Sequence, residues 1–236
     1  MGKRRKKKRK QNTVLKLILS IVAVLTILIA GVVCFYVSRL NIHNGTWGRE
    51  IDLTDEACAN TLLWLSDIND AEVNEDFVRE ILGEDRIILP VYLELNQTKL
   101  GEGTYKIYID SDDYAQCEKR ATGLAADCLT EIIDKTLKKD SSFDNGKTVN
   151  EMVEQILGES LESYLENKEL KLISSKEKLI QENEKEGTYT ISTNKITWEF
   201  EGEAVTEDIV RNKDYIFLPD ENVIYRLVKN IYQNEQ

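Results

Sequence analysis

Residues 17–37 read LILSIVAVLTILIAGVVCFYV, a run of 21 residues without a charged side chain. A helix rises about 1.5 Å per residue, so about 20 apolar residues cross the roughly 30 Å hydrocarbon core of a bilayer. An aromatic pair near the end of the run stands where such residues gather at the membrane interface, and Arg39 follows. We therefore predict one transmembrane helix over residues 13–39, with residues 14–37 in contact with the bilayer.

A cluster of basic residues precedes this apolar run. Lys and Arg stay on the cytoplasmic side of a membrane. We therefore expect a cytoplasmic tail over 1–12, a linker over 40–44 and an extracellular domain over 45–232. The cluster would also attract anionic lipids of the inner leaflet, although its effect on orientation alone explains it as well. Its members are Lys3, Arg4, Arg5, Lys6, Lys7, Lys8, Arg9 and Lys10.

The apolar run favours retention in the cell membrane over cleavage. A cleaved signal peptide has an apolar core of about 7–15 residues and small residues at the cut site. This run is longer, and no pair of small residues follows it. A lipoprotein signal needs a small residue before the modified cysteine, but Val33 precedes Cys34. We expect an uncleaved, single-pass signal anchor.

The part of the chain after the apolar run is strongly acidic. Removing the ten basic residues before position 41 from the total of 31 leaves 21 basic against 42 acidic residues, a net charge near −21. This charge disfavours binding to nucleic acids and favours cations or basic partners, although solubility alone also explains it. The composition, rich in Lys, Glu, Asn and Ile and poor in Pro, is typical of a low-GC Gram-positive bacterium.

Three cysteines follow the span, at Cys58, Cys117 and Cys128. The second and third are eleven residues apart on one expected helix, about 16 Å along its axis, so they cannot bond to each other. A bridge from Cys58 to either of the others stays open, as does the alternative of three buried thiols.

The exported part contains both strand and helix patterns. Apolar residues at every second position predict strands, and apolar stripes at helical spacing behind capping residues predict helices. The turn-forming segment 98–103 predicts an antiparallel hairpin between two of the strands. Grouped strands around a helical block indicate an α+β domain in which strands from both ends share one sheet. The expected strands are about 45–53, 88–97, 104–110 and 187–228 (with 205–218 as one of its members), and the expected helices about 55–66, 74–82, 112–139 and 149–184.

A short phrase occurs three times in the expected strands. It reads Gly-Thr-Trp at 45–47 and Gly-Thr-Tyr at both 103–105 and 187–189, and Asn-Lys-Ile-Thr follows at 194–197. These segments resemble small bacterial lipocalin-like surface domains. The resemblance implies a curved antiparallel sheet, a partial lipocalin-like barrel, with a binding role and no reaction. Residues 111–186 are an insertion that such a barrel does not need, and we expect them to cover the sheet.

No catalytic, metal or nucleotide motif stands out, so we expect no enzyme activity, cofactor or metal. His43 is the only histidine and falls in the linker, which leaves histidine triads and zinc motifs without partners. The chain has neither a Gly-x-Ser-x-Gly elbow nor a Walker loop. Paired carboxylates of a cell-envelope hydrolase remain an alternative. The strand acids that would serve it, which we otherwise expect on the solvated face, are Glu50, Asp52, Glu94, Glu199 and Glu201.

Arg49 is the weak candidate for a ligand contact. It shares the alternating face of Trp47 and Ile51, where the other residues are apolar. An arginine there either binds a ligand carboxylate in the concavity of the sheet, or pairs with a neighbouring acid, or lies at the rim. We expect a membrane-tethered extracellular domain that binds an unknown ligand or envelope partner. A signalling or scaffold role that uses the basic tail is a further alternative.

Overall fold

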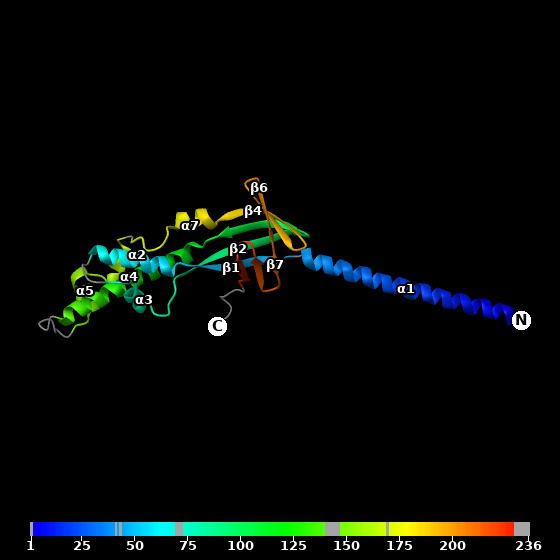
Figure 1. Ribbon diagram of the computed structural model, residues 1–236, viewed down its shortest axis with the longest axis horizontal. Coiled ribbons are helices and arrows are strands. Elements are labelled where there is room, and N and C mark those ends of the chain that lie inside the picture. The colour runs from blue at the N-terminus through cyan, green and yellow to red at the C-terminus, as the bar shows by residue number, and fades with distance from the viewer. Residues whose placement is uncertain are drawn as a thin grey trace.

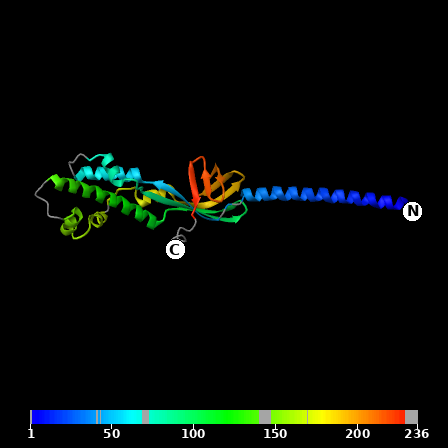
Figure 2. The same cartoon turned by 90° about the horizontal axis from the view of Figure 1, so that it is seen from below.

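The computed structural model describes residues 2–40, 42, 44–68, 73–139, 147–168 and 170–228. Helix α1 (Gly2–Leu40) projects from one end of the molecule, the strands form the middle, and the other helices form the far end (Figures 1 and 2). His43 and residues 229–232 of the expected exported domain lie outside the described residues, as do the side chains of the basic cluster.

Helix α1 contains a segment long and apolar enough to cross a membrane. Among the described residues this segment is Leu19–Ser38, with a mean hydropathy of 2.7 and no part buried against the rest of the chain. The helix begins before the expected start at residue 13 and runs without a break to Leu40. The structure is thus compatible with the expected anchor.

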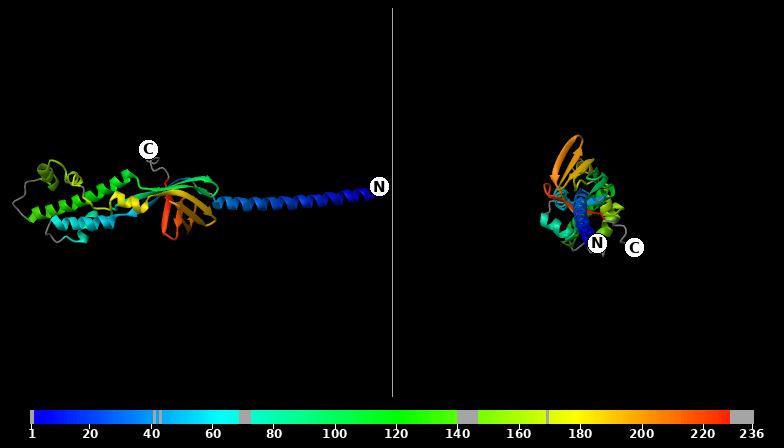
Figure 3. Two further views of the ribbon diagram at one scale, coloured as in Figure 1. Left: turned by 90° about the horizontal axis from the view of Figure 1, so that it is seen from above. Right: turned by 90° about the vertical axis from the view of Figure 1, so that its right-hand side faces the viewer.

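The strands form one antiparallel sheet that is nearly closed into a barrel. The order is β6-β5-β4-β3-β2-β1-β9-β8-β7, and the two edge strands are separated in sequence only by Ile209. The C-terminal strands turn away from the long strands and give the sheet its curl (Figure 3). The bounds are β1 Gly45–Asp52, β2 Ile88–Lys99, β3 Glu102–Tyr108, β4 Lys185–Ser192, β5 Lys195–Phe200, β6 Glu203–Asp208, β7 Val210–Arg211, β8 Tyr215–Leu218 and β9 Val223–Leu227.

This architecture confirms the α+β class and the shared sheet. β1 pairs with β2 on one side and with the last strand, β9, on the other, so the first and last strands of the chain meet in the sheet. The hairpin β2–β3 forms as predicted. β2 ends two residues later than expected, at Lys99, and β3 both begins and ends two residues earlier than expected, at Glu102 and Tyr108. A nearly closed antiparallel barrel is compatible with a lipocalin-like fold.

Two copies of the repeated phrase pair with each other. In the β3–β4 ladder, Gly103 lies opposite Tyr189 and Gly187 lies opposite Tyr105. Both tyrosines point into the barrel, where Tyr105 is 4% exposed and Tyr189 is 1% exposed. A Cβ on Gly103 would come within 2.7 Å of two atoms of the Tyr189 ring. Each glycine therefore makes room for the aromatic ring opposite, a pairing that bends a sheet and fills its interior.

The remaining helices occupy the loops between β1 and β2 and between β3 and β4. They pack on the far ends of β1–β3, where Leu53, Leu89, Val91 and Ile109 join them in one apolar cluster. Most of the helical part extends beyond the sheet, so the expectation that residues 111–186 cover the sheet is only partly met (Figure 1). The helices are α2 Thr54–Ile68, α3 Glu75–Leu82, α4 Ser111–Lys139, α5 Val149–Leu157, α6 Leu161–Glu166 and α7 Lys176–Asn183.

Two predicted segments are divided in the structure. The segment expected to be helical over 149–184 contains three helices, because Gly158 takes a left-handed conformation (φ 79°) that ends α5, and Ser160 and Ser175 cap new starts. The expected strand 205–218 is likewise three strands, β6, β7 and β8. The chain bends between β6 and β7 because Ile209 turns inward, where it is 5% exposed, and its amide donates to the Asn194 carbonyl at 2.8 Å.

All four cysteines are free thiols in the structure, so the bridge left open for Cys58 is not formed. Cys58 and Cys128 lie in one apolar cluster between α2, α3 and α4, and Cys117 lies in another. Burial raises the pKa of each of these three thiols, and that of Cys128 to about 12. They behave as small apolar residues and are poor nucleophiles at neutral pH.

Candidate functional site

A cavity of about 390 Å³ lies between the inner face of the sheet, the end of α7 and the turn between β8 and β9. Its volume falls within the range of about 300–1,000 Å³ that is usual for small-molecule sites. The walls are largely aromatic and aliphatic, from Leu93, Tyr105, Ile107, Trp198, Phe200, Val205, Leu218 and Tyr225. Charged residues complete the lining, namely Arg49, Lys185, Glu182, Glu203, Glu207 and Glu221.

Arg49 lines this cavity from β1, on the inner face where the sequence predicted it. Its Nη2 donates to the Asn183 Oδ1 at 2.5 Å, and its guanidinium lies 5.8 Å from the centre of the Tyr225 ring. The Asn183 amide is fixed in turn, because its Nδ2 donates to the Leu179 carbonyl at 2.9 Å. Among the described residues Arg49 forms no ion pair with an acid, and its Nε is buried without a hydrogen-bond partner.

Glu207 is the buried acid of the cavity, only 6% exposed. The indole Nε1 of Trp198, on the neighbouring strand, donates to its carboxylate. Burial raises the pKa of Glu207, and the hydrogen bond from Trp198 opposes this effect. Within the described part of the chain Glu207 has no ion-pair partner. The charge of Lys185 also lowers the pKa of Glu207, but it is the smallest of the influences on that pKa. The fold thus holds a carboxylate against an apolar wall without a bonded cation.

The aromatic residues of the cavity are held by one another. The rings of Tyr105 and Trp198 meet edge to face with centroids 4.7 Å apart. Tyr225 is 3% exposed, and burial raises its pKa, although the charge of Arg49 opposes the shift. Such rigid π faces bind organic cations as well as apolar groups.

The charge of the cavity favours a cationic guest. Four of its lining residues are acids and two are basic. The chain from residue 41 onward carries a net charge near −21, so its field attracts cations from solution. A carboxylate that has lost its hydration without gaining an ion pair is costly, and a cation that reaches it offsets this cost. The arrangement can bind a small molecule with an apolar body and a positive group.

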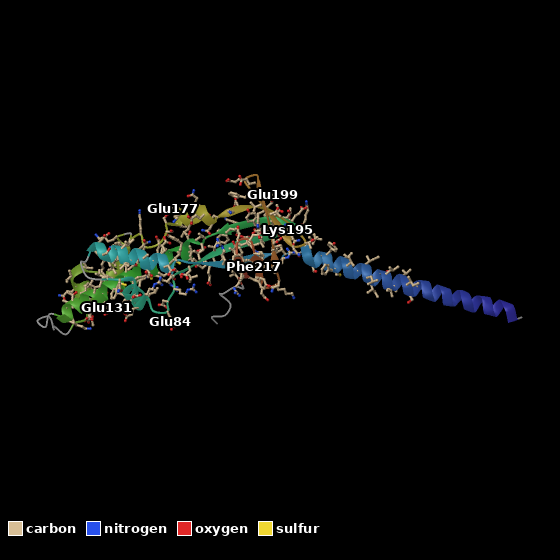
Figure 4. The ribbon with its side chains drawn as sticks, viewed as in Figure 1. Glu84, Glu131, Glu177, Lys195, Glu199 and Phe217 are labelled. Atoms are coloured by element: carbon tan, nitrogen blue, oxygen red, sulfur yellow. The ribbon has the colours of Figure 1, made fainter. Side chains whose placement is uncertain are left out.

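The strand acids considered for hydrolysis lie on the outer surface and do not converge. Asp52 accepts from the Thr54 amide and pairs with Arg86 at 2.5 Å, which lowers its pKa to about 2. Glu199 accepts from the Thr188 hydroxyl at 3.0 Å and lies at the outer surface of the barrel (Figure 4). Glu50 and Glu201 are exposed, and Glu94 belongs to another part of the outer face. The structure gathers no two of these acids around a common pocket with an aromatic wall.

Sequence reasoning missed Glu207. Acids on strands were all assigned to the solvated face, which is correct for most of them. A signal was present: Val205, Glu207 and Ile209 occupy alternate positions, and the last of these is an obvious inward residue. The approach of Asn183 to Arg49, across 134 positions of sequence, left no local signal.

Comparison of the chain with protein-family models, with curated proteins and with solved structures found no match.

Proposed function

We propose that the protein is a membrane-tethered binding domain, with α1 as its anchor and the barrel cavity as its ligand site. In this proposal the N-terminus is cytoplasmic and the barrel is extracellular, because the basic cluster stays inside. The lipocalin-like resemblance supports the same role, since barrels of this kind enclose small ligands. The binding is non-catalytic.

The single observation that carries the proposal is the composition of the cavity around Glu207. A buried carboxylate that has no ion-pair partner within the described part of the chain faces a wall of aromatic and aliphatic side chains. Structural acids in a barrel interior are usually paired, because an unpaired one opposes folding. A ligand cation that pairs with Glu207 would offset the free-energy cost of burying this carboxylate.

The proposed ligand is a small amphipathic amine. Its ammonium group pairs with Glu207, and its apolar body contacts Trp198 and Tyr105. Arg49 contributes the opposite wall and remains the proposed contact for a ligand oxygen, because its Nε has no acceptor among the described residues. The rim acids, Glu182, Glu203 and Glu221, add to the attraction without touching the buried end.

A matched set of probes tests this proposal. The full chain in lipid nanodiscs is titrated with 3-phenylpropylamine, 3-phenylpropanol and 3-phenylpropionate, which share one apolar body and differ in charge. The proposal predicts that the amine raises the melting temperature of the barrel, the alcohol raises it less and the carboxylate does not raise it. Equal effects of the three probes, or none from any of them, would contradict the proposal.

Two matched variants assign the effect to the cavity. Glu207→Gln keeps the shape of the side chain and its acceptor for Trp198 but removes the charge, so it should abolish the preference for the amine. Glu199→Gln removes an acid from the adjacent strand on the outer surface, and it should leave the preference unchanged. If both variants behave alike, the attraction belongs to the general acidity of the domain.

A further inference from the structure

The turn between β2 and β3 lies against the last residue of α1. Gly101 occupies this turn with φ at 76°, and a Cβ built on it would lie 3.7 Å from the Leu40 Cδ2. Leu40 also packs against the core of the barrel. Ile42 is 4% exposed inside the same core, and its amide donates to the Gln97 Oε1 at 3.1 Å. Leu40 and Ile42, at the end of α1 and just after it, thus both contact the barrel.

This contact fixes the height of the turn relative to a bilayer. The apolar segment of α1 ends at Ser38, and Leu40 follows two residues later, about 3 Å along the helix axis. The headgroup layer adds about 5–7 Å on each side of the hydrocarbon core. A turn that touches Leu40 therefore lies at the depth of the headgroups.

The side chains at this end suit such a position. Leu100 stands at the tip of the turn and is 50% exposed, so an apolar side chain projects from this end of the barrel. Lys99 pairs with Glu102 at 3.4 Å, and Lys195 in the neighbouring β4–β5 turn pairs with Asp208 at 3.8 Å. Figure 4 shows Lys195 beside the end of α1. An apolar tip with balanced charges is the part of this acidic domain that an anionic membrane surface repels least.

We infer that the β2–β3 turn docks on the outer leaflet, with Leu100 in the interfacial layer of the lipid. This inference rests on the proposed function in one respect, because it requires α1 to be the membrane anchor. The partner is the lipid surface itself. The turn extends the apolar surface of α1, and both contact the lipid. α1 and the turn together hold the barrel at a fixed orientation.

The docking has a consequence for ligand access. β4 runs from Lys185, which lines the cavity, to Ser192, which lies beside the docked turn. Seven steps of about 3.3 Å separate the two residues by about 23 Å. The α7 side of the cavity therefore faces away from the bilayer, and a ligand enters it from the aqueous phase.

Spin labels on the full chain test the docking. In a Cys34→Ser background the three remaining cysteines are at most 3% exposed, so the introduced cysteine should be the one that the label reaches in the native state. A nitroxide is attached to Leu100→Cys or, as a control, to Val205→Cys, which is 59% exposed on β6. The chain is reconstituted in vesicles of phosphatidylcholine with a minor share of phosphatidylglycerol. The measurement compares collision of each label with oxygen, which partitions into lipid, and with a water-soluble nickel chelate.

Docking predicts an oxygen-to-nickel ratio at position 100 that exceeds the ratio at position 205 several-fold. Equal ratios at the two positions would overturn the inference. A third label at Leu28→Cys, within the apolar segment, separates this failure from a failure of the anchor. If the label at position 28 collides mainly with oxygen while the ratio at position 100 equals the ratio at position 205, the anchor stands and the docking is wrong. If that label is also open to nickel, the anchor fails, and the docking fails with it.

Discussion

The glycine–tyrosine pairs of the barrel predict a sharp penalty for adding one methyl group at Gly187. A Cβ there would lie 1.9 Å from the Glu199 carbonyl oxygen and 3.3 Å from the Tyr105 ring. The first of these atoms belongs to the backbone of β5 and cannot rotate away, so the β4–β5 ladder has to shift. Gly187→Ala should therefore be strongly destabilising.

The magnitude follows from two opposing effects. Overpacking of a filled interior costs about 1–3 kcal/mol, and a backbone clash belongs at the upper end of that range. Replacement of glycine also restricts the unfolded chain and returns roughly 0.4–1 kcal/mol. The net loss in the free energy of unfolding is about 2 kcal/mol, which lowers the melting temperature of a chain of this size by roughly 4–8 °C.

Guanidinium chloride unfolding of the full chain in detergent, followed by tryptophan fluorescence, measures this loss. All three tryptophans lie beyond residue 45, so the signal reports on the part of the chain that follows α1. Gly123→Ala is the matched control, because the nearest atom to its Cβ would be the Glu162 Oε1 at 4.0 Å. Because Gly123 lies inside α4, Gly123→Ala should raise the free energy of unfolding by up to about 1 kcal/mol. A Gly187→Ala variant as stable as this control would refute the packing of β4 described above.

Three further predictions concern titration and thiol chemistry. Burial raises the folded-state pKa of Glu207 above its unfolded value, so the folded chain binds the extra proton, and stability falls as the pH rises from near 4.5 through the folded pKa. Glu207→Gln should accordingly stabilise the ligand-free chain at pH 7 and not at pH 4; an equal gain at both values would contradict the burial. Asp52, with its pKa lowered to about 2 by Thr54 and Arg86, should have the opposite dependence. Asp52→Asn should cost about 1 kcal/mol at pH 7, a value discounted for its exposed ion pair, and the cost should decline as the pH falls from near 4 through the folded pKa; an undiminished cost well below that pKa would refute the assignment. In the native chain, a charged maleimide should modify none of the three exported cysteines before unfolding, as mass spectrometry will show; rapid labelling of any of them would place that thiol outside the core.

Local patterns predicted the elements that depend on neighbours in sequence. The β2–β3 hairpin follows from alternation and from the turn chemistry of residues 98–103, both of which are readable over a few positions. The capping box of Thr148 and Glu151 at the start of α5 depends likewise on residues only three positions apart. The inward face of β1, with Arg49 beside Trp47, is also correct because strand alternation leaves only two choices.

The parts that depend on distant pairing could not be predicted in this way. The repeated Gly-Thr-Tyr phrase was visible, but nothing in the sequence said that Gly103 would face Tyr189 and not solvent. The cavity is lined by β1, α7 and the β8–β9 turn. Its charged residues come together only when these distant elements assemble. Glu207 shows this most clearly, because its burial results from the curl of the whole sheet.

The affinity of the cavity for an amine tests the central claim most directly. Isothermal titration of the full chain in nanodiscs measures the dissociation constant of 3-phenylpropylamine for the unmodified protein and for Glu207→Gln at pH 7. The account predicts saturable binding to one site, weakened at least about tenfold, or about 1.4 kcal/mol, in the variant. Binding of equal strength to both proteins, or no binding to either, would contradict it.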